Sequence, residues 1–429
     1  MKKQIFDKLR FIFLILVISC IQVVTFLNAM GKSNLKILSF AIYILGAISF
    51  IIYICYKLIY KKKYNLYDVL IMLLTIFAII STVFAFNRNV ALWGAPSRYE
   101  GLFSILSYYS FFLLATTIDK KHHHIIMYFI VAWGILQVAI GTIQVLQIDT
   151  ILGYDRSHNW STQFTSALGT LSNPNFYCTY VLMCGLWALG NLLKANTIIQ
   201  KIIYSLLVSI FIYGLIIGNT TSSILVFVFV ATLAICFNIK LKKIKQNLLP
   251  ILVCLTLAPM VLYLINDYTN NRLYVKLKRI VDYDIVAIIK GGLDDSTGQY
   301  RIYVWKETLK EVPKHLLTGI GLDNFRYIKN GGPISVVTEY KTRRFDKAHN
   351  DYLQILSTEG IFTLIFYMML VLNVLNIALT TDIKHKEYGI VLSFVGYLLQ
   401  MLMVFSFISV APVFYMIMGF VVNTKLVKE

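Results

Sequence analysis

Charged residues are scarce in this chain. Only 14% of its 429 residues are Asp, Glu, Lys or Arg, 58% are hydrophobic, and the mean hydropathy is +0.70. Soluble globular domains carry about 25% charged residues. The composition therefore excludes a soluble globular protein and predicts an all-α fold, a polytopic transmembrane helical bundle.

Other common features are also missing. No small-residue cleavage site follows the first apolar segment, and a second apolar segment comes directly after it, so we expect an anchor rather than a signal peptide. All six cysteines fall inside apolar segments, which argues against disulfides in outer loops. The basic residues form no single patch, which makes nucleic acid a poor candidate for a partner.

Long apolar segments fill most of the chain. Twelve of them suffice to span a membrane, which takes about 20 residues. They lie near 11–30, 37–57, 67–86, 101–118, 125–147, 173–193, 201–218, 220–238, 248–265, 361–381, 388–406 and 411–425. Lysine is concentrated in alternate loops, such as residues 61–63 and 240–245, and this pattern predicts that both termini are cytoplasmic.

The spacing of the spans divides the chain into three regions. Residues 1–265 form a nine-span membrane region, 266–360 a large extracytoplasmic loop, and 361–429 a three-span membrane region. The loop mixes charges with apolar runs, so we expect it to fold against the membrane surface. Helices are predicted near 301–311 and 348–358, separated by glycine-rich turns.

Three consecutive histidines, His122 to His124, look like a metal-binding tract. They follow Lys120 and Lys121 at a cytoplasmic helix start and have no Cys or carboxylate cluster near them in sequence. We therefore predict a solvated interfacial turn rather than a metal site.

A fourth histidine has a more informative setting. His349 lies where the large loop re-enters an apolar segment, within the run Lys347-Ala348-His349-Asn350-Asp351. A histidine there titrates near neutral pH and can remove a proton from a substrate held at the membrane surface. On local sequence alone, His349 could equally be a helix-end residue packed against the surface.

Arginine is distributed differently from lysine. On the predicted topology every arginine except Arg10 lies on the outer side. These outer arginines are Arg88, Arg98, Arg156, Arg272, Arg279, Arg301, Arg326, Arg343 and Arg344. The planar guanidinium binds phosphate oxygens bidentately, so the set predicts an anionic ligand at the outer surface. For any single arginine, a contact with lipid headgroups or with acids of the same loop is the better explanation.

Other patterns compete for the same roles. His158 precedes an asparagine in an outer loop and is the alternative base. Asp282 and Asp284 have the spacing of a divalent-metal carboxylate pair, but nucleotide sugars are cytoplasmic and this segment is predicted outside, so a structural acid pair is favoured. The glycines at 319 and 321 lack the third glycine and the preceding strand of a dinucleotide fingerprint.

Several short motifs together resemble the bacterial O-antigen ligase and polymerase superfamily of membrane glycosyltransferases. The loop motifs are Tyr300-Arg301, Trp305, Pro313, Gly319-Ile320-Gly321, Phe325, His349-Asn350, Tyr352-Leu353 and Glu359-Gly360-Ile361. Earlier motifs are Gly94, Arg98, Glu100-Gly101-Leu102, Gly169-Thr170 and Asn173-Pro174-Asn175. Their order and their placement between spans make the resemblance specific, and it covers about residues 80–410.

The resemblance implies a multi-pass enzyme of the bacterial cytoplasmic (inner) membrane with its site facing outside. It would move a glycan from a polyprenyl-pyrophosphate donor to a hydroxyl of a glycan or lipid-anchored acceptor. His349 would be the general base and Arg301 the main cation for the leaving pyrophosphate. Arg98, Arg156, Asn350, Tyr352 and Asn175 would bind substrate. We expect an inverting reaction without metal or cofactor.

Two departures from the family pattern weaken part of this scheme. The family often has arginine ahead of the Gly-Thr motif and after the serine that opens the eighth span. Here those places read Thr165-Ser166-Ala167-Leu168 and Thr221-Ser222-Ser223-Ile224, so Arg156 is the nearby substitute.

Two other classes of protein remain as alternatives. A lipid-linked glycan transporter, or flippase, would also have many spans and outer cations, but such proteins often show similar halves and charged residues inside the membrane. The two halves here differ and the spans contain almost no charge. A non-catalytic envelope assembly protein would leave the outer arginines and His349 unexplained. Within the enzyme class, ligase and polymerase stay open.

Overall fold

The computed structural model describes residues 2–146, 166–240, 295, 297–337, 342–380 and 387–426. Its α-helices are α1 (Lys2–Ala29), α2 (Leu35–Ile59), α3 (Leu66–Val83), α4 (Arg88–Trp93), α5 (Leu102–Ala115), α6 (Lys120–Val145), α7 (Pro174–Leu192), α8 (Ile198–Gly218), α9 (Thr221–Lys240), α13 (Thr297–Glu311), α14 (Asp351–Glu359), α15 (Ile361–Thr380), α16 (Tyr388–Gln400) and α17 (Ala411–Leu426). The predicted span at 248–265 lies outside the described residues, as do Arg156, Arg272, Arg279, His158, Asp282 and Asp284.

Six of these helices are long and apolar enough to cross a membrane: α1, α2, α3, α6, α8 and α15. Four shorter apolar segments, in α5, α9, α16 and α17, accompany them. The prediction of an all-α, multi-pass membrane protein is thereby supported, while the number of twelve spans stays a prediction. One small β-hairpin, β1 (Ile334–Val337) paired antiparallel with β2 (Thr342–Phe345), was not predicted.

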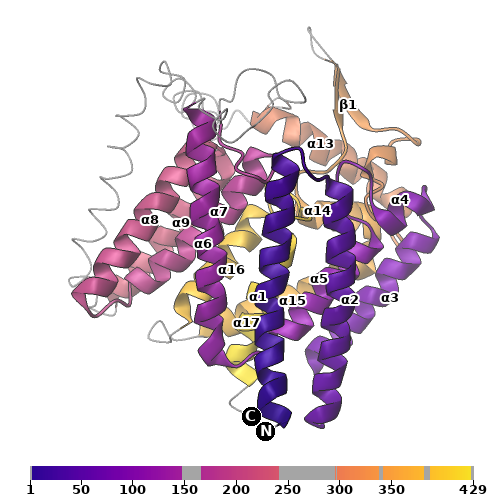
Figure 1. Ribbon diagram of the computed structural model, residues 1–429. Helices are drawn as coiled ribbons and strands as arrows, with labels where there is room; N and C mark the ends of the chain where they lie inside the picture. Colours follow the sequence, from indigo (N-terminus) through magenta and orange to yellow (C-terminus); the bar gives the residue numbers. More distant parts are fainter. Residues whose placement is uncertain are drawn as a thin grey trace.

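The ends of the bundle differ. Helix α1 begins and α17 finishes at one end, whereas α13, α14 and the hairpin cap the opposite end (Figure 1). Termini on one side agree with the topology expected from the lysine pattern. Which end faces the cytoplasm stays a prediction.

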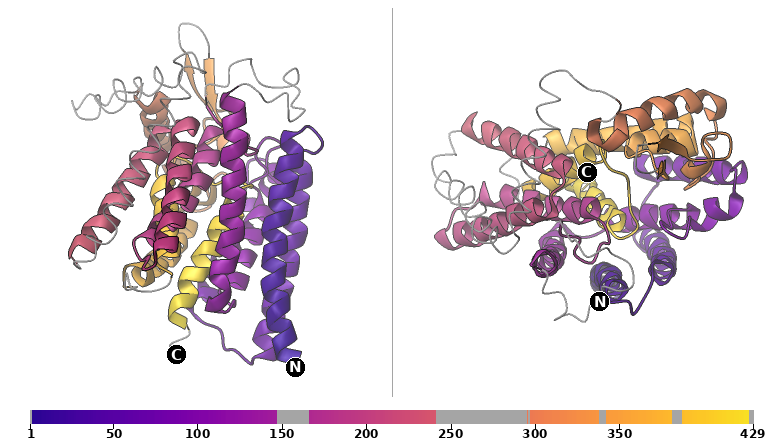
Figure 2. Two further views of the ribbon diagram at one scale, coloured as in Figure 1. Left: turned by 60° about the vertical axis from the view of Figure 1, so that its left-hand side comes forward. Right: turned by 90° about the horizontal axis from the view of Figure 1, so that it is seen from above.

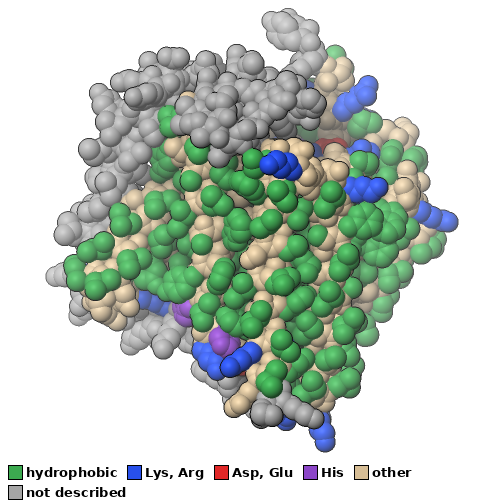
Figure 3. Space-filling view, viewed as in Figure 1, with side chains coloured by type: hydrophobic (Ala, Val, Ile, Leu, Met, Phe, Trp, Pro, Cys, Tyr) green, Lys and Arg blue, Asp and Glu red, His purple; other side chains and the backbone are tan. Residues whose placement is uncertain are grey.

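The helices form an inner and an outer set. Helix α7 is buried along almost its whole length and packs against α8 and α16, because glycines allow close approach. A Cβ on Gly190 would lie 2.5 Å from the Cα of Gly389 in α16. Small residues serve this purpose in membranes, where apolar surface alone does not select helix partners. The outer helices present apolar side chains on the surface (Figure 3).

The described part of the predicted outer loop folds as a compact layer. Val304 of α13 packs with Phe325, Ile334 and Ala348 in a small core separate from the main one. Viewed from above, this layer covers one part of the bundle (Figure 2). The predicted helices at 301–311 and 348–358 correspond to α13 and α14. Residues 297–337 and 342–359 thus fold as a layer on the helical bundle, and its position at the membrane surface stays a prediction.

The prediction that the histidine tract forms a solvated turn is wrong at His123. This residue lies in the first turn of α6 with its side chain fully buried, and its Nδ1 lies 2.6 Å from Oε1 of Glu387 at the start of α16. Its Nε2 lies 3.0 Å from the carbonyl oxygen of Ile118. His123 therefore joins α6 to the start of α16.

Helix α16 is shorter than its predicted span. It ends at Gln400, and the chain then turns through residues 401–410 before α17 begins. Asp351 accounts for this ending: its backbone N–H donates to the carbonyl of Met401 at 2.9 Å, and its carboxylate accepts from the N–H and the hydroxyl of Ser406, both at 2.9 Å. The turn consequently lies against the N-terminus of α14.

Candidate active site

A short segment, residues 345–350, carries His349 and is held from both sides. The N–H of Ala348 donates to Oε1 of Gln354 at 2.8 Å, and its carbonyl accepts from Nε1 of Trp305 at 2.9 Å. Asn350 caps α14 by accepting from the N–H of Leu353 at 3.0 Å. His349 itself has φ +53°, a left-handed conformation that is uncommon for a residue with a side chain. The surrounding bonds therefore impose an unusual backbone at the candidate base.

The imidazole of His349 is half-buried between two aromatic rings. Phe345 and Phe405 contact it edge to face, with centroids at 6.2 and 5.3 Å. Its Nδ1 is buried and has no hydrogen-bond partner in the part of the chain that the structure describes. Burial and, to a smaller extent, the positive charge of Arg301 lower the pKa of His349 to about 4. The charge of Asp346 acts in the opposite direction but is the smaller effect. The ring is therefore neutral at neutral pH and able to accept a proton.

Arg301 lies on the helix that supports this segment. It is one turn before Trp305 in α13, so both side chains share a helix face. Trp305 bonds to the carbonyl of Ala348, directly before His349. This placement explains why the charge of Arg301 acts on His349.

Arg98 approaches the same segment from the loop before α5. Its Nε donates to Oδ2 of Asp346 at 2.8 Å and its Nη2 donates to Oδ1 at 3.1 Å, a bidentate pair. Its guanidinium also lies 5.2 Å from the ring centroid of Phe405. Burial opposes the charged form of Asp346, but the hydrogen bonds and charge of Arg98, together with the charge of Lys347, lower the pKa of that carboxyl. Part of the charge of Arg98 is therefore already compensated.

The structure describes three of the other four predicted binding residues. The amide oxygen of Asn350 caps α14, and the hydroxyl of Tyr352 donates to the carbonyl of Leu398 in α16 at 2.9 Å. Asn175 is half-buried at the start of α7, where its N–H donates to Asn173 at 2.8 Å. The next residue, Phe176, contacts Phe405 with a centroid distance of 5.5 Å. Arg156 lies outside the described residues.

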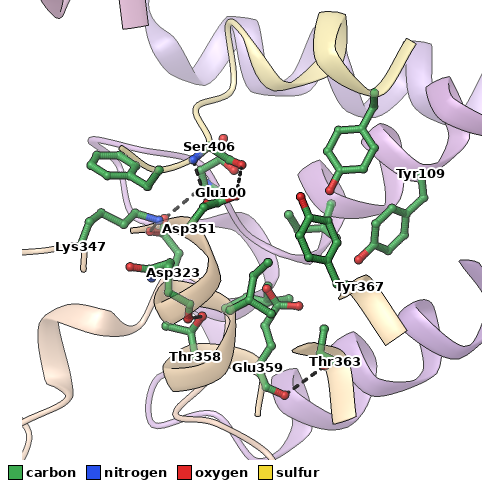
Figure 4. A pocket seen from close by; sticks show the side chains of 16 residues that line it. Glu100, Tyr109, Asp323, Lys347, Asp351, Thr358, Glu359, Thr363, Tyr367 and Ser406 are labelled. Atoms are coloured by element: carbon green, nitrogen blue, oxygen red, sulfur yellow. Dashed lines mark hydrogen bonds and ion pairs between the residues drawn. The ribbon is translucent and has the colours of Figure 1, made fainter. Parts of the chain in front are cut away.

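A small polar cavity of about 40 Å³ lies beside the candidate site. It has room for a few water molecules, not for a sugar. Its lining includes four acids and one lysine, namely Glu100, Asp323, Asp351, Glu359 and Lys347 (Figure 4). Burial raises the pKa of Glu100 to about 8, against the effect of Lys347, and burial together with Asp351 raises the pKa of Glu359 to about 8. The two glutamates are therefore largely protonated at neutral pH.

Phe405 is the site residue that sequence reasoning missed most completely. Its ring contacts His349, Arg98 and Phe176, and it lines the cavity as well. In the sequence it falls at the end of an apolar run and carries no chemical signal. Asp346, next to the His349 motif, was the acid that could have been predicted as a partner for an arginine.

The fold and the site define a multi-pass membrane protein with a neutral histidine and two arginines near one end of its bundle. Residues 206–368 match the family model for O-antigen ligase. This match confirms, for that part of the chain, the resemblance to the O-antigen ligase and polymerase superfamily. No curated protein matches the chain. The family implies a glycosyltransferase-type membrane enzyme, a glycan ligase or polymerase, with a lipid-linked glycan donor and a glycan acceptor.

Proposed function

We propose that this protein transfers a glycan from a polyprenyl-pyrophosphate carrier to an acceptor hydroxyl on the outer face of the bacterial cytoplasmic membrane. The observation that carries this proposal is a neutral His349 whose Nδ1 has no hydrogen-bond partner among the described residues. The charges of Arg301 and Arg98 both lower the pKa of this histidine. A neutral base beside two guanidiniums suits a reaction that removes a proton and expels a pyrophosphate.

The chemistry assigns a distinct task to each group. The acceptor oxygen attacks the anomeric carbon of the donor from the face opposite the pyrophosphate, which inverts that carbon. His349 takes the hydroxyl proton as the new glycosidic bond forms. The electron pair of the broken carbon–oxygen bond goes to the pyrophosphate, where guanidinium groups stabilise the added charge.

The two arginines contribute unequally in this scheme. The charge of Arg301 lowers the pKa of His349 more strongly than the charge of Arg98 does, so we assign the larger share of leaving-group stabilisation to Arg301. Asn350 and Tyr352 use their polar groups in helix-supporting bonds, and their proposed contribution is to shape the site. Asn175 and Arg156 remain proposed contacts for the pyrophosphate or glycan.

The site lies at the end of the bundle opposite the start of α1 and the finish of α17 (Figure 1). The lysine-rich loops predict that those termini are cytoplasmic, so the proposed active site faces outward. Polyprenyl-linked glycans are used on that face, which makes the proposed chemistry and the proposed topology consistent. The three regions 1–265, 266–360 and 361–429 are retained as the proposed division of the chain.

The surface glycan of a deletion strain tests the function in cells. Loss of long chains, with single repeats still attached to the surface, would identify a polymerase. Accumulation of full-length chains on the lipid carrier would identify a ligase. An unchanged surface glycan together with an unchanged lipid-linked pool would contradict both.

Transfer is expected to persist in excess chelator, because guanidinium groups rather than a divalent cation carry the leaving-group charge in this scheme. The measurement is glycan transfer by the purified protein with and without chelator. A loss of activity restored by magnesium or manganese would contradict the prediction and would favour Asp282 and Asp284 as metal ligands.

The acid limb of the pH profile should lie well below neutral pH. Because kcat/KM for the donor reports the free enzyme, its acid limb should follow the lowered pKa of His349, about 4. A bound pyrophosphate would offset the charges of Arg301 and Arg98, so the limb of kcat should lie at higher pH than that of kcat/KM. If the acid limbs of kcat and kcat/KM both lay near 6.5, the ordinary pKa of histidine, this account would be contradicted.

A further inference from the structure

Lys347 and Asp323 form a deeply buried ion pair beside the candidate site. Nζ of Lys347 lies 2.8 Å from Oδ1 of Asp323, and the two side chains are 4% and 1% exposed. Figure 4 shows the pair at the edge of the polar cavity. Buried ion pairs add little net stability compared with apolar residues of similar size, so the position of this pair is more informative than its energy.

The carboxylate of Asp323 holds both sides of the turn that carries Arg98. Its Oδ2 accepts from the N–H of Ala95 at 2.6 Å and from the N–H of Glu100 at 3.3 Å. Arg98 lies between these two residues in the chain. One carboxylate therefore binds the turn around Arg98 and, through its other oxygen, the ammonium group of Lys347.

Lys347 belongs to the segment that carries His349. The preceding residue, Asp346, is the bidentate partner of Arg98. Nζ of Lys347 also lies 5.7 Å from the ring centroid of Phe405, which contacts the imidazole of His349 on another side. The ion pair consequently connects the turn around Arg98 to the segment around His349.

Lys347 supplies a positive charge at this place. Among the described residues that line the cavity it is the single lysine or arginine, facing Glu100, Asp323, Asp351 and Glu359. An ammonium group surrounded by carboxyl groups has a strongly preferred position. The ion pair therefore fixes the segment around His349 in addition to the hydrogen bonds made by the backbone of Ala348.

We propose that Lys347 and Asp323 are positioning residues that set His349 relative to the guanidinium of Arg98. Neither needs to touch the substrate. This inference rests on the proposed function of His349 as the base. It assigns the buried pair a role in turnover in addition to its role in folding.

Removing the two charges one after the other distinguishes an effect on turnover from an effect on folding. Lys347→Met alone leaves Asp323 uncompensated and should lower the melting temperature. Adding Asp323→Asn removes the second charge and keeps an oxygen for the amides of Ala95 and Glu100, so most of the melting temperature should return. In this double variant kcat should remain about 100-fold low, because small misplacements cost that much, while KM for the donor changes little. Recovery of kcat together with the melting temperature would overturn the positioning role.

The matched control is the buried pair Lys57 and Asp68, 2.6 Å apart and 10% and 7% exposed, at the other end of the bundle. Lys57→Met with Asp68→Asn should change the melting temperature without changing kcat. Lys347→Arg is the second test: it keeps the charge but lengthens a buried side chain, so kcat should fall at temperatures where the variant is still folded. An unchanged kcat there would also contradict the proposal. Absence of transfer by the wild-type protein would instead refute the proposed function itself.

Discussion

Replacing His349 with alanine is expected to lower glycan transfer by a factor of about 100 or more, because a general base contributes about 10²–10⁴-fold to such reactions. The ring makes edge-to-face contacts with Phe345 and Phe405 but no hydrogen bond through Nδ1 within the described residues. Expression and donor binding should therefore change little. The measurement is transfer to acceptor in membranes containing equal amounts of each variant.

His315 provides a matched control for this substitution. It is an exposed histidine in the same loop layer, within the 3₁₀ helix η4 (Val312–His315). His315→Ala should transfer glycan at the wild-type rate. Normal transfer by His349→Ala combined with a loss in His158→Ala would move the base to His158.

Arg301→Lys should impair transfer almost as severely as Arg301→Ala. Lysine keeps the positive charge but loses the planar fork that binds two phosphate oxygens at once. Loss of transition-state stabilisation of about 3 kcal/mol corresponds to roughly 100-fold in kcat, the scale seen when an oxyanion donor is removed. The measurement is kcat with a saturating lipid-linked donor.

Arg344 is the control for the arginine substitutions. It is exposed on β2 and pairs through the backbone with Ser335 of β1, so Arg344→Lys should behave like the wild type. Wild-type rates for Arg301→Lys with a loss in Arg98→Lys would transfer the leading role to Arg98. Tolerance of lysine at both positions would remove the proposed basis of leaving-group stabilisation.

The helices were predictable because a membrane span demands a long apolar run. The predicted spans at 37–57 and 361–381 match α2 (Leu35–Ile59) and α15 (Ile361–Thr380) closely. The end of α16 was not predictable, since residues 401–406 are apolar enough to continue the helix. It ends because Asp351, far away in sequence, supplies bonds to Met401 and Ser406.

The sequence selected the candidate residues of the site but not the residues that bind to them. His349, Arg301 and Arg98 were selected from their residue types and neighbours, and their charges interact in the structure. The pairing of Arg98 with Asp346 joins residues 248 positions apart, and that of His123 with Glu387 joins residues 264 positions apart. Local sequence carries no signal for such pairs. The hairpin β1–β2 was missed for a related reason, since its short strands alternate weakly and β2 is largely exposed.

Purified protein in lipid vesicles, supplied with a polyprenyl-pyrophosphate-linked glycan and an acceptor glycan, provides the most direct test of the proposed chemistry. The account predicts that free polyprenyl pyrophosphate and the lengthened acceptor appear in equal amounts, and that His349→Ala produces neither. Movement of an intact donor across the bilayer with no lengthened acceptor would contradict it and would identify a transporter instead.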